Sequence, residues 1–165
     1  MKEFRFVNEL GSREIGDTIG VLEKPRLWIP ETDYPDYYFW LEKVEEELGK
    51  DLKRGLLAYA GKEPVGAVLY QRHKGLDGTV EIKNISVSPD MRGRYFGAFM
   101  LRNVEMEALN FEYPDCDRIM VDTKTTNNDM IGFLLRQGYE PKTRTDLYGL
   151  GTGEDIVFTK SSDEK

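Results

Sequence analysis

The sequence predicts an α/β fold, a mixed, mostly antiparallel central sheet of about seven strands with helices on both faces. Two observations lead to this prediction. Short β-rich runs bounded by turn signals recur along the chain. Between them lie longer stretches in which apolar residues return every three or four positions, as in amphipathic helices. The 165 residues fit one domain, which we expect at residues 1–160, followed by a disordered tail at residues 161–165.

The first predicted helix lies near residue 40. Its apolar residues share one helical stripe: Tyr37, Leu41, Val44 and Leu48. Two β-rich runs follow, GLLAYAG and PVGAVLYQRHK, and the GKE between them predicts a hairpin. After the turn signal GLDG a third strand begins, TVEIKNISVS.

The third strand contains a phase slip. Val80 and Ile82 follow one alternation of apolar residues. Ile85 and Val87 follow the opposite one. A β-bulge at Lys83–Asn84 would produce the slip, and bulges often lie beside active sites. A strand buried on both faces would also weaken the alternation, so both interpretations stay open.

The second half of the chain continues as helix, strand, helix and two strands. A long helix is predicted from about Gly93 to Phe111, because apolar residues recur there at i+4 spacing. RIMVDTK predicts a strand, and NDMIGFLLRQG predicts a helix that ends at Gly138. YEPKTRTDLYGLGTGEDIVFTK predicts two more strands around a glycine-rich turn.

Charge and composition argue against several classes of function. The chain has 23 basic and 30 acidic residues, a net charge of −7, whereas a nucleic-acid partner requires a basic face. The single cysteine, Cys116, allows no internal disulfide, and with one histidine, His73, it leaves no clustered ligands for a metal. No apolar run approaches about 18 residues, and the first residues have no signal-peptide core. We therefore expect a soluble, cytoplasmic protein with no metal, membrane or nucleic-acid partner.

The stretch SVSPDMRGRYFGAFML carries the strongest functional signal. A strand, a glycine-containing turn and a helix start follow one another, and together they present unpaired backbone N–H groups at the positive end of a helix dipole. Such a site binds anions, most often phosphate, and Arg92 and Arg94 would add charge at its rim. The two common nucleotide loops do not match. A glycine-punctuated turn with solvated arginines is the alternative.

This stretch resembles the acetyl-CoA loop of the GNAT superfamily of N-acetyltransferases, whose motif is Q/R-x-x-G-x-G/A after a V-x-P strand end. Arg92 takes the first position and Gly97 the last, with Ala98 beyond. VDTKTTNNDMIGFLLRQGYEP is similar to the family's second cofactor segment, and Asn127 and Gly138–Tyr139 fall at the matching spacing. The two motifs cover roughly residues 80–140, and the order of the predicted elements is also the family's.

The resemblance implies an N-acetyltransferase that moves an acetyl group from acetyl-CoA to a primary amine of a small molecule or protein. A non-catalytic acyl-CoA-binding sensor or interaction module is the alternative. The amides of residues 93–98 would hold the pyrophosphate, while strand residues 85–87 and Asn127 would contact the pantetheine arm. The implied cofactor-binding residues are Ile85, Ser86, Val87, Arg92, Gly93, Arg94, Tyr95, Phe96, Gly97, Ala98 and Asn127. Homodimerisation is left open.

Glu81 is the candidate catalytic residue, as general base. It precedes Arg92 by eleven residues, the spacing at which some GNAT enzymes place a catalytic glutamate. Partial burial would raise the affinity of its carboxylate for a proton towards the useful range. An ion pair with a neighbouring lysine or arginine is the alternative. Asp122, on the adjacent predicted strand, is a second candidate base.

Two positions depart from the family pattern. Tyr95 replaces the usual first glycine of the loop, which would cost about 1 kcal/mol or more if the backbone needs a positive φ and little if the residue lies in the first helical turn. Leu134 replaces a tyrosine that in many members protonates the leaving thiolate. Nothing in the sequence places Tyr139 or Tyr148 in that role.

An aromatic segment surrounds the start of the first predicted helix. Its members are Trp28, Tyr34, Tyr37, Tyr38, Phe39 and Trp40. In the family this region helps to wall the acceptor site, and with Asp33 and Asp36 it could hold a cationic amine. Core packing is the alternative. We expect His73 at the surface and Cys116 packed as a small apolar side chain.

Overall fold

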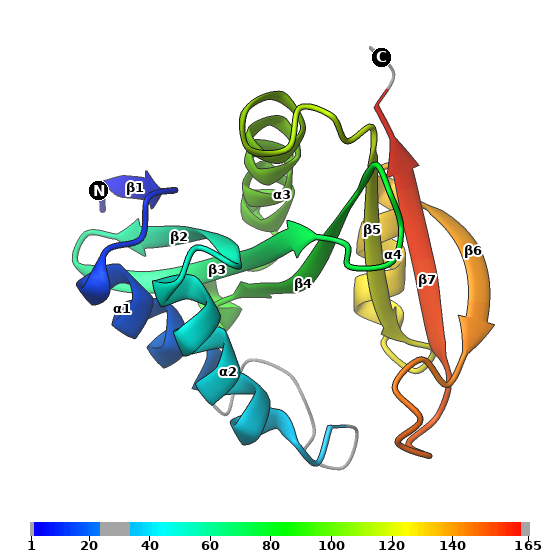
Figure 1. Ribbon diagram of the computed structural model, residues 1–165. Coiled ribbons are helices and arrows are strands. Elements are labelled where there is room, and N and C mark those ends of the chain that lie inside the picture. Colours follow the sequence, from blue (N-terminus) through cyan, green and yellow to red (C-terminus); the bar gives the residue numbers. More distant parts are fainter. Residues whose placement is uncertain (1, 24–33, 163–165) are drawn as a thin grey trace.

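The structure is a computed structural model that describes residues 2–23 and 34–162. Within these residues seven strands form one sheet in the order β1-β2-β3-β4-β5-β7-β6 (Figure 1). The β4–β5 pair is parallel, and the other neighbouring pairs are antiparallel. The predicted fold class, with about seven strands in a mixed sheet, is confirmed.

The strands are β1 (Phe4–Val7), β2 (Arg54–Ala60), β3 (Glu63–Arg72), β4 (Thr79–Val87), β5 (Arg118–Lys124), β6 (Glu140–Thr145) and β7 (Asp155–Ser161). The α-helices are α1 (Ser12–Glu23), α2 (Tyr37–Gly49), α3 (Phe96–Glu107) and α4 (Asn128–Arg136). A short 3-10 helix, η1 (Pro89–Met91), precedes α3, and a π-helical turn, η2 (Ala108–Glu112), follows it.

Helices cover both faces of the sheet, as predicted (Figure 1). On one face α3 and α4 pack on the strands through a core that includes Met100, Val104 and Leu134. On the other face α1 and α2 pack on β2 and β3 through two smaller clusters that include Leu22, Val44 and Leu69. The predicted apolar stripe of α2 is the side that packs, since Leu41, Val44 and Leu48 are buried and Tyr37 packs against them.

Strand β4 contains a bulge, the first of the two interpretations of its phase slip. Leu69 of β3 lies opposite Asn84, and Tyr70 lies opposite Ile82, so Lys83 is an extra residue in the ladder. Because of this insertion both Ile82 and Ile85 reach the core on the α3 face. Asn84 lies on the opposite face, with Leu69 and helices α1 and α2.

Strand β1 and helix α1 were not predicted. The apolar period is present in α1, where Ile15, Ile19 and Leu22 face the second core cluster. Two glycines, Gly16 and Gly20, interrupt the helix, and interior glycine lowers helix propensity by about 1 kcal/mol relative to alanine. Packing on the sheet outweighs this local cost.

Two boundaries differ from the prediction. Helix α3 begins at Phe96 and not near Gly93, because Gly93 and Tyr95 have φ values of 72° and 60°, which a right-handed helix cannot contain. At the C-terminal end β7 includes Ser161, and the Ser162 N–H donates to Asp117 O at 2.8 Å. Regular pairing therefore extends into the segment expected to be a disordered tail, of which residues 163–165 lie outside the described part.

Within residues 2–23 and 34–162 no helix is both long enough and apolar enough to cross a membrane.

Candidate active site

Strands β4 and β5 separate partway along their length. Their parallel register runs from Thr79 opposite Arg118 to Ile82 opposite Val121. Among the described residues no further pair joins these strands, although β4 continues to Val87 and β5 to Lys124. The two strands diverge from this point, which we call the fork (Figure 1). Beyond the fork residues 85–87 present a strand edge that an extended ligand could pair with.

The loop after β4 is compact. Arg92 is exposed, and its Nε donates to the carbonyl of Val87 at 3.0 Å, which ties the loop back to the strand. The first hydrogen bond of α3 joins the Phe99 N–H to Tyr95 O at 2.9 Å. The three N–H groups before it, those of residues 96–98, therefore have no partner inside the helix and lie at the positive end of its dipole.

Tyr95 adopts the left-handed conformation, with φ 60° and ψ 6°, at the N-cap of α3. Of the two alternatives for Tyr95, the structure has the positive φ and not a place in the first helical turn. The positive φ is the one with the higher conformational cost for a tyrosine. The residue is 88% exposed, so its ring extends into solvent and does not fill the loop. Phe96, in contrast, is buried against Phe4 and Phe6, and only its backbone can face a ligand. Arg94 is exposed.

Asn127 has a local structural role. It is the N-cap of α4, and its side-chain oxygen accepts the Met130 N–H at 3.2 Å. The residue lies three positions after the end of β5, at the open end of the fork. The cap uses one lone pair of Oδ1, so Nδ2 and the second lone pair could bind a ligand arm while the cap is kept.

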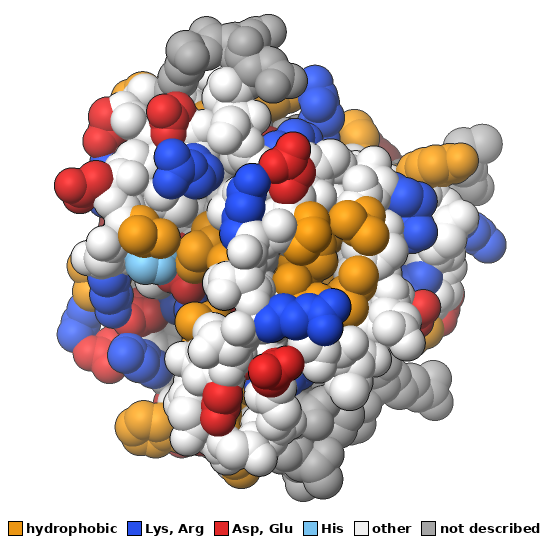
Figure 2. Space-filling view, turned by 90° about the vertical axis from the view of Figure 1, so that its right-hand side faces the viewer, with side chains coloured by type: hydrophobic (Ala, Val, Ile, Leu, Met, Phe, Trp, Pro, Cys, Tyr) orange, Lys and Arg blue, Asp and Glu red, His pale blue; other side chains and the backbone are white. Residues whose placement is uncertain are grey.

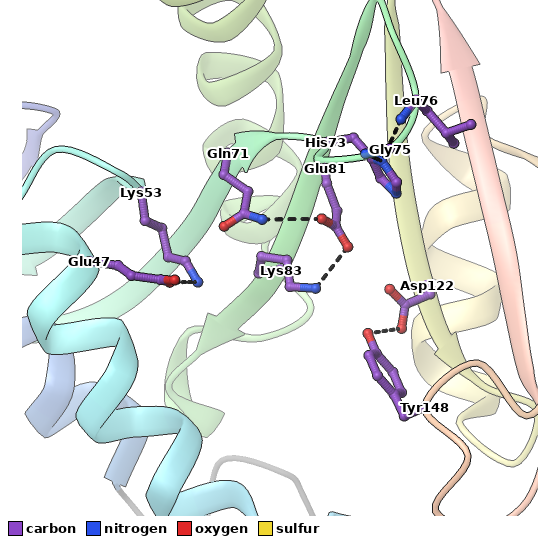
Figure 3. A network of polar contacts seen from close by, with 10 residues as sticks. All are labelled: Glu47, Lys53, Gln71, His73, Gly75, Leu76, Glu81, Lys83, Asp122 and Tyr148. Atoms are coloured by element: carbon purple, nitrogen blue, oxygen red, sulfur yellow. Dashed lines mark hydrogen bonds and ion pairs between the residues drawn. The ribbon is translucent and has the colours of Figure 1, made fainter.

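A chain of polar side chains lies on the α1–α2 face of the sheet at the fork (Figure 3). The Glu81 carboxylate is 8% exposed, and its Oε1 lies 2.7 Å from Lys83 Nζ. Its other oxygen accepts from Gln71 Nε2 at 3.4 Å. The ion pair that was the alternative reading of Glu81 is thus present, and it places a lysine directly on the candidate base.

Asp122 lies on the neighbouring strand and faces the same cluster (Figure 3). Tyr148 O–H donates to its Oδ2 at 2.9 Å. Burial raises the pKa of the Asp122 carboxyl, although the positive charge of Lys83 and the Tyr148 hydrogen bond oppose this rise. Lys83 Nζ lies 5.8 Å from the centre of the Tyr148 ring. The lysine thus contacts the Glu81 carboxylate, lies near the Tyr148 ring, and its charge acts on Asp122.

The β6–β7 loop supplies Tyr148, which the sequence could not place. Desolvation and the neighbouring Asp122 carboxylate raise the pKa of its hydroxyl above the ordinary tyrosine value, at which the group is already protonated at neutral pH. Tyr139 lies elsewhere, since it is buried and its O–H donates to Glu105 at 2.9 Å. Leu134 is fully buried in the main core. Neither can act at the fork.

Asn84 is a site residue that sequence reasoning missed. It is 5% exposed, and its Oδ1 accepts from Ser86 Oγ at 2.6 Å. Its Nδ2 is buried with no hydrogen-bond partner among the described residues. A buried unpaired donor beside the bulge is costly unless a ligand satisfies it. The bulge at Lys83–Asn84 was the only signal in the sequence that pointed to this position.

His73 and Cys116 have structural roles. His73 Nδ1 accepts the N–H groups of Gly75 and Leu76, at 3.0 and 2.9 Å, and so shapes the turn between β3 and β4 (Figure 3). Cys116 is fully buried, with Arg72 Nη1 3.4 Å from its sulfur. Within residues 2–23 and 34–162 no three His, Cys, Asp or Glu side chains are grouped as metal ligands.

The aromatic segment divides between packing and the site. Tyr37 stacks on Trp40, with ring centres 5.5 Å apart, and its hydroxyl donates to Leu22 O, so these rings join α2 to α1. Tyr34 lies edge-on to Tyr148 at 6.4 Å and extends the aromatic wall of the polar cluster. Tyr38 and Phe39 are exposed. The expectations for Trp28 and Asp33 lie outside the described residues.

A hollow of about 510 Å³ lies away from this site, between α4 and β6. Its apolar side chains form part of the orange area on the face seen in Figure 2, with Lys142 and Arg144 among the lining residues. None of the residues that line it is a candidate catalytic or cofactor-binding residue. The candidate residues thus lie at the fork and not in this hollow.

Comparisons with known proteins agree with this architecture. The tRNA(Met) cytidine acetyltransferase of Aeropyrum pernix is 29% identical over 148 residues, covering 86% of this chain and 18% of that protein. The chain thus spans less than a fifth of this curated relative's length.

Two solved structures share the fold. A GNAT-family structure from Desulfovibrio desulfuricans has a TM-score of 0.78 at 15% identity and covers 96% of this chain and 99% of its own. A spermidine N-acetyltransferase chimera that includes the Vibrio cholerae enzyme has a TM-score of 0.72 at 10% identity, with 96% and 95% covered. The sequence model of the acetyltransferase (GNAT) family matches residues 22–139. Since that match spans more than half of the chain, the chain belongs to the GNAT acetyltransferase family.

Proposed function

We propose that this protein transfers an acetyl group from acetyl-CoA to a primary amine, with Glu81 as the general base. One observation carries the proposal. At the fork, beside the free edge of β4, the Glu81 carboxylate contacts the Lys83 amine at 2.7 Å, and that amine's charge also acts on the carboxylate of Asp122. An acceptor amine needs a carboxylate that binds and deprotonates it beside the thioester carbon, and the thioester of a ligand paired with residues 85–87 would end at the fork.

The residues beside the fork fit acetyl-CoA. The N–H groups of residues 96–98 and the exposed Arg92 suit its pyrophosphate, and the unpaired edge at residues 85–87 suits its pantetheine amides. A Cβ at Gly97 would lie 3.6 Å from Val87 Cγ2, so the glycine keeps the space between α3 and β4 open. When bound, acetyl-CoA supplies the activated acyl group.

A general base is needed because only a neutral amine can attack. A lysine-like amine, with pKa near 10.4, pays roughly 4–5 kcal/mol to lose its proton at pH 7. Glu81 can take that proton, and Asp122 faces the same place with its pKa raised towards neutrality. The buried Asn84 Nδ2, which has no partner among the described residues, would be a donor for a ligand carbonyl that reached the bulge.

The acceptor is proposed to be a small molecule or a protein amine. The net charge of −7 favours a cationic acceptor and opposes an RNA partner, although the Aeropyrum pernix relative is named for a tRNA substrate. A cytoplasmic location belongs to the same proposal.

The second candidate function is a module that binds an acyl-CoA without turnover. Leu134 favours it, because the core leucine removes the family's usual proton donor.

An acetyl-transfer assay across a panel of amines tests the proposal. The panel should contain polyamines, peptides with free N-termini and lysine peptides, with CoA release as the readout. We expect transfer to at least one class and a loss of 10²–10⁴-fold in kcat for Glu81→Gln. Asp122→Asn, assayed beside it, is the matched carboxylate-to-amide change. Acetyl-CoA binding without transfer to any amine would favour the non-catalytic module, and salt-dependent RNA binding would favour a nucleic-acid substrate.

A further inference from the structure

The side-chain amine of Lys83 lies at the position where the acceptor amine is expected to bind. Its Nζ lies 2.7 Å from Oε1 of Glu81, the group that would take the acceptor's proton. The same Nζ is 5.8 Å from the Tyr148 ring centre, and its charge acts on Asp122. The side chain is 17% exposed, so it is neither sealed in the core nor free in solvent.

The backbone places this amine close to the expected acyl group. Lys83 is the bulged residue and follows Ile82, the last residue of β4 that pairs with β5. In the proposed function the pantetheine arm lies along residues 85–87, so its thioester end would reach the fork beside Lys83. Figure 3 shows the Lys83 side chain extending between Glu81 and the Asp122–Tyr148 pair.

We propose that Lys83 is a self-acetylation site, at which the chain transfers the acetyl group of its own bound acetyl-CoA to Lys83 Nζ when no acceptor is present. This inference rests on the proposed function, since it uses the same thioester and the same base. No other co-reactant is required.

The reaction balances as an ordinary aminolysis. The Lys83 ammonium gives one proton to the Glu81 carboxylate, and the neutral nitrogen forms a bond to the thioester carbonyl carbon. The C–S bond breaks, and the second proton lost from nitrogen neutralises the CoA thiolate. Glu81 then releases its proton to solvent. The products are an amide at Lys83 and free CoA.

Lys53 provides a matched control within the same chain. It is also a buried lysine paired with a glutamate, 3% exposed and 2.8 Å from Glu47 (Figure 3). Burial lowers the pKa of its ammonium, against the effect of Glu47, but the same burial keeps dissolved acetyl-CoA from its nitrogen. Lys53 directly precedes β2, which β3 separates from β4, and the charges of Lys83 and Glu81 still act on its ammonium. Non-enzymatic acetylation from solution would favour exposed lysines and spare both buried ones, whereas acetylation from the bound thioester would favour Lys83 over Lys53.

The test is incubation of the full chain with isotopically labelled acetyl-CoA and no amine, followed by peptide mass mapping. We expect one acetyl group on Lys83, formed at least tenfold faster than on Lys53. The first-order rate should not change over a tenfold dilution of the protein, because the transfer occurs within one chain. Glu81→Gln should slow it by at least tenfold, and Lys83→Arg should leave residue 83 unmodified. Addition of an accepted amine should slow the reaction by competition.

The outcomes separate this inference from the proposed function. Transfer to an added amine with Lys83 unmodified would overturn the self-acetylation and leave the proposed function intact. Equal labelling of Lys53 and Lys83, or a rate that rises with protein concentration, would also overturn it. Labelling of Lys83 without transfer to any panel amine would support it and limit the failure to the choice of amines. Neither reaction, in a protein that binds acetyl-CoA, would refute both.

Discussion

The hydroxyl of Tyr148 donates a hydrogen bond to the carboxylate of Asp122 at 2.9 Å, and this contact joins the β6–β7 loop to strand β5. The loop is otherwise glycine-rich, with positive φ at Gly149, Gly151 and Gly153. Lys124 Nζ, which donates to Gly153 O at 3.3 Å, ties the loop to β5 a second time. The Tyr148–Asp122 contact also places a neutral donor on a carboxylate whose desolvation favours its protonated form.

Asp122→Asn should stabilise the fold at neutral pH. The pKa of Asp122 is raised on folding, so its ionisation favours the unfolded chain, and this cost grows as the pH rises through the folded-state pKa. The amide removes that cost and still accepts the Tyr148 hydrogen bond. Thermal unfolding should show a higher Tm for the variant at pH 7, with the difference vanishing below about pH 3.9, the ordinary aspartate value.

Glu140→Gln is the control for this pH series. Glu140 is exposed on β6, and the hydrogen bond from Lys142 lowers its pKa, which is the opposite sign. Its replacement should give no stabilisation at pH 7. A Tm of Asp122→Asn equal to or below that of the wild type at pH 7 would show that the ionised carboxylate does not destabilise the folded state.

Tyr95→Gly should stabilise the protein by up to about 1 kcal/mol. The left-handed conformation costs a side-chain-bearing residue roughly 1–2 kcal/mol, and glycine removes this cost. Because glycine also loses more conformational entropy on folding, about half of the gain in stability is cancelled. Because the ring is 88% exposed, its loss removes little packing. Tyr95→Ala is the matched variant, since it loses the ring but keeps the strain. Urea unfolding should rank Tyr95→Gly above Tyr95→Ala, and the reverse order would refute the strain argument.

The elements that could be predicted are those with a strong local period or punctuation. The stripe of α2, the β2–β3 hairpin, the bulge in β4 and the end of α4 before Gly138 all depend on neighbours within a few residues. β1 and α1 depend on distant packing: β1 is a four-residue edge strand, and α1 contains two glycines. Tertiary contacts with β2 and β3 stabilise both elements, and these contacts cannot be predicted from the residues next to them in the sequence.

The site divides in the same way. The loop residues 92–98 and Glu81 could be proposed from motif spacing, because they lie close together in the sequence. Tyr148 reaches Asp122 across 26 positions through the β6–β7 loop, and Asn84 matters only because its amide is buried without a partner. Such relations depend on where strands pair. The conformation of Tyr95 was equally invisible, since its φ is set by the turn as a whole.

Leu134→Ala should destabilise the fold by about 2–5 kcal/mol, the usual range for a leucine removed from a packed core. Leu134 is fully buried among residues of α3, β5 and β7. Its neighbour Leu135 is 51% exposed, and Leu135→Ala should change stability by no more than about 0.5 kcal/mol. Denaturant midpoints of the two variants measure the difference. Similar midpoints would mean that residue 134 does not have the core role described above.

Gly97→Ala should separate stability from cofactor binding. Gly97 has no left-handed φ, and an added Cβ would meet Val87 and Phe133 at 3.6–3.7 Å, so the variant should fold and gain up to about 1 kcal/mol of helix propensity. The new methyl would narrow the space beside Val87 where the pantetheine arm is proposed to lie. In the wild type, acetyl-CoA at 100 times its Kd should add about 2.7 kcal/mol, a shift of several degrees in Tm, and ATP should add none. Gly97→Ala should lose most of that shift. Gly20→Ala in α1, whose added Cβ meets nothing within 4 Å, should keep it in full, and an undiminished shift in Gly97→Ala would place the ligand elsewhere on the chain.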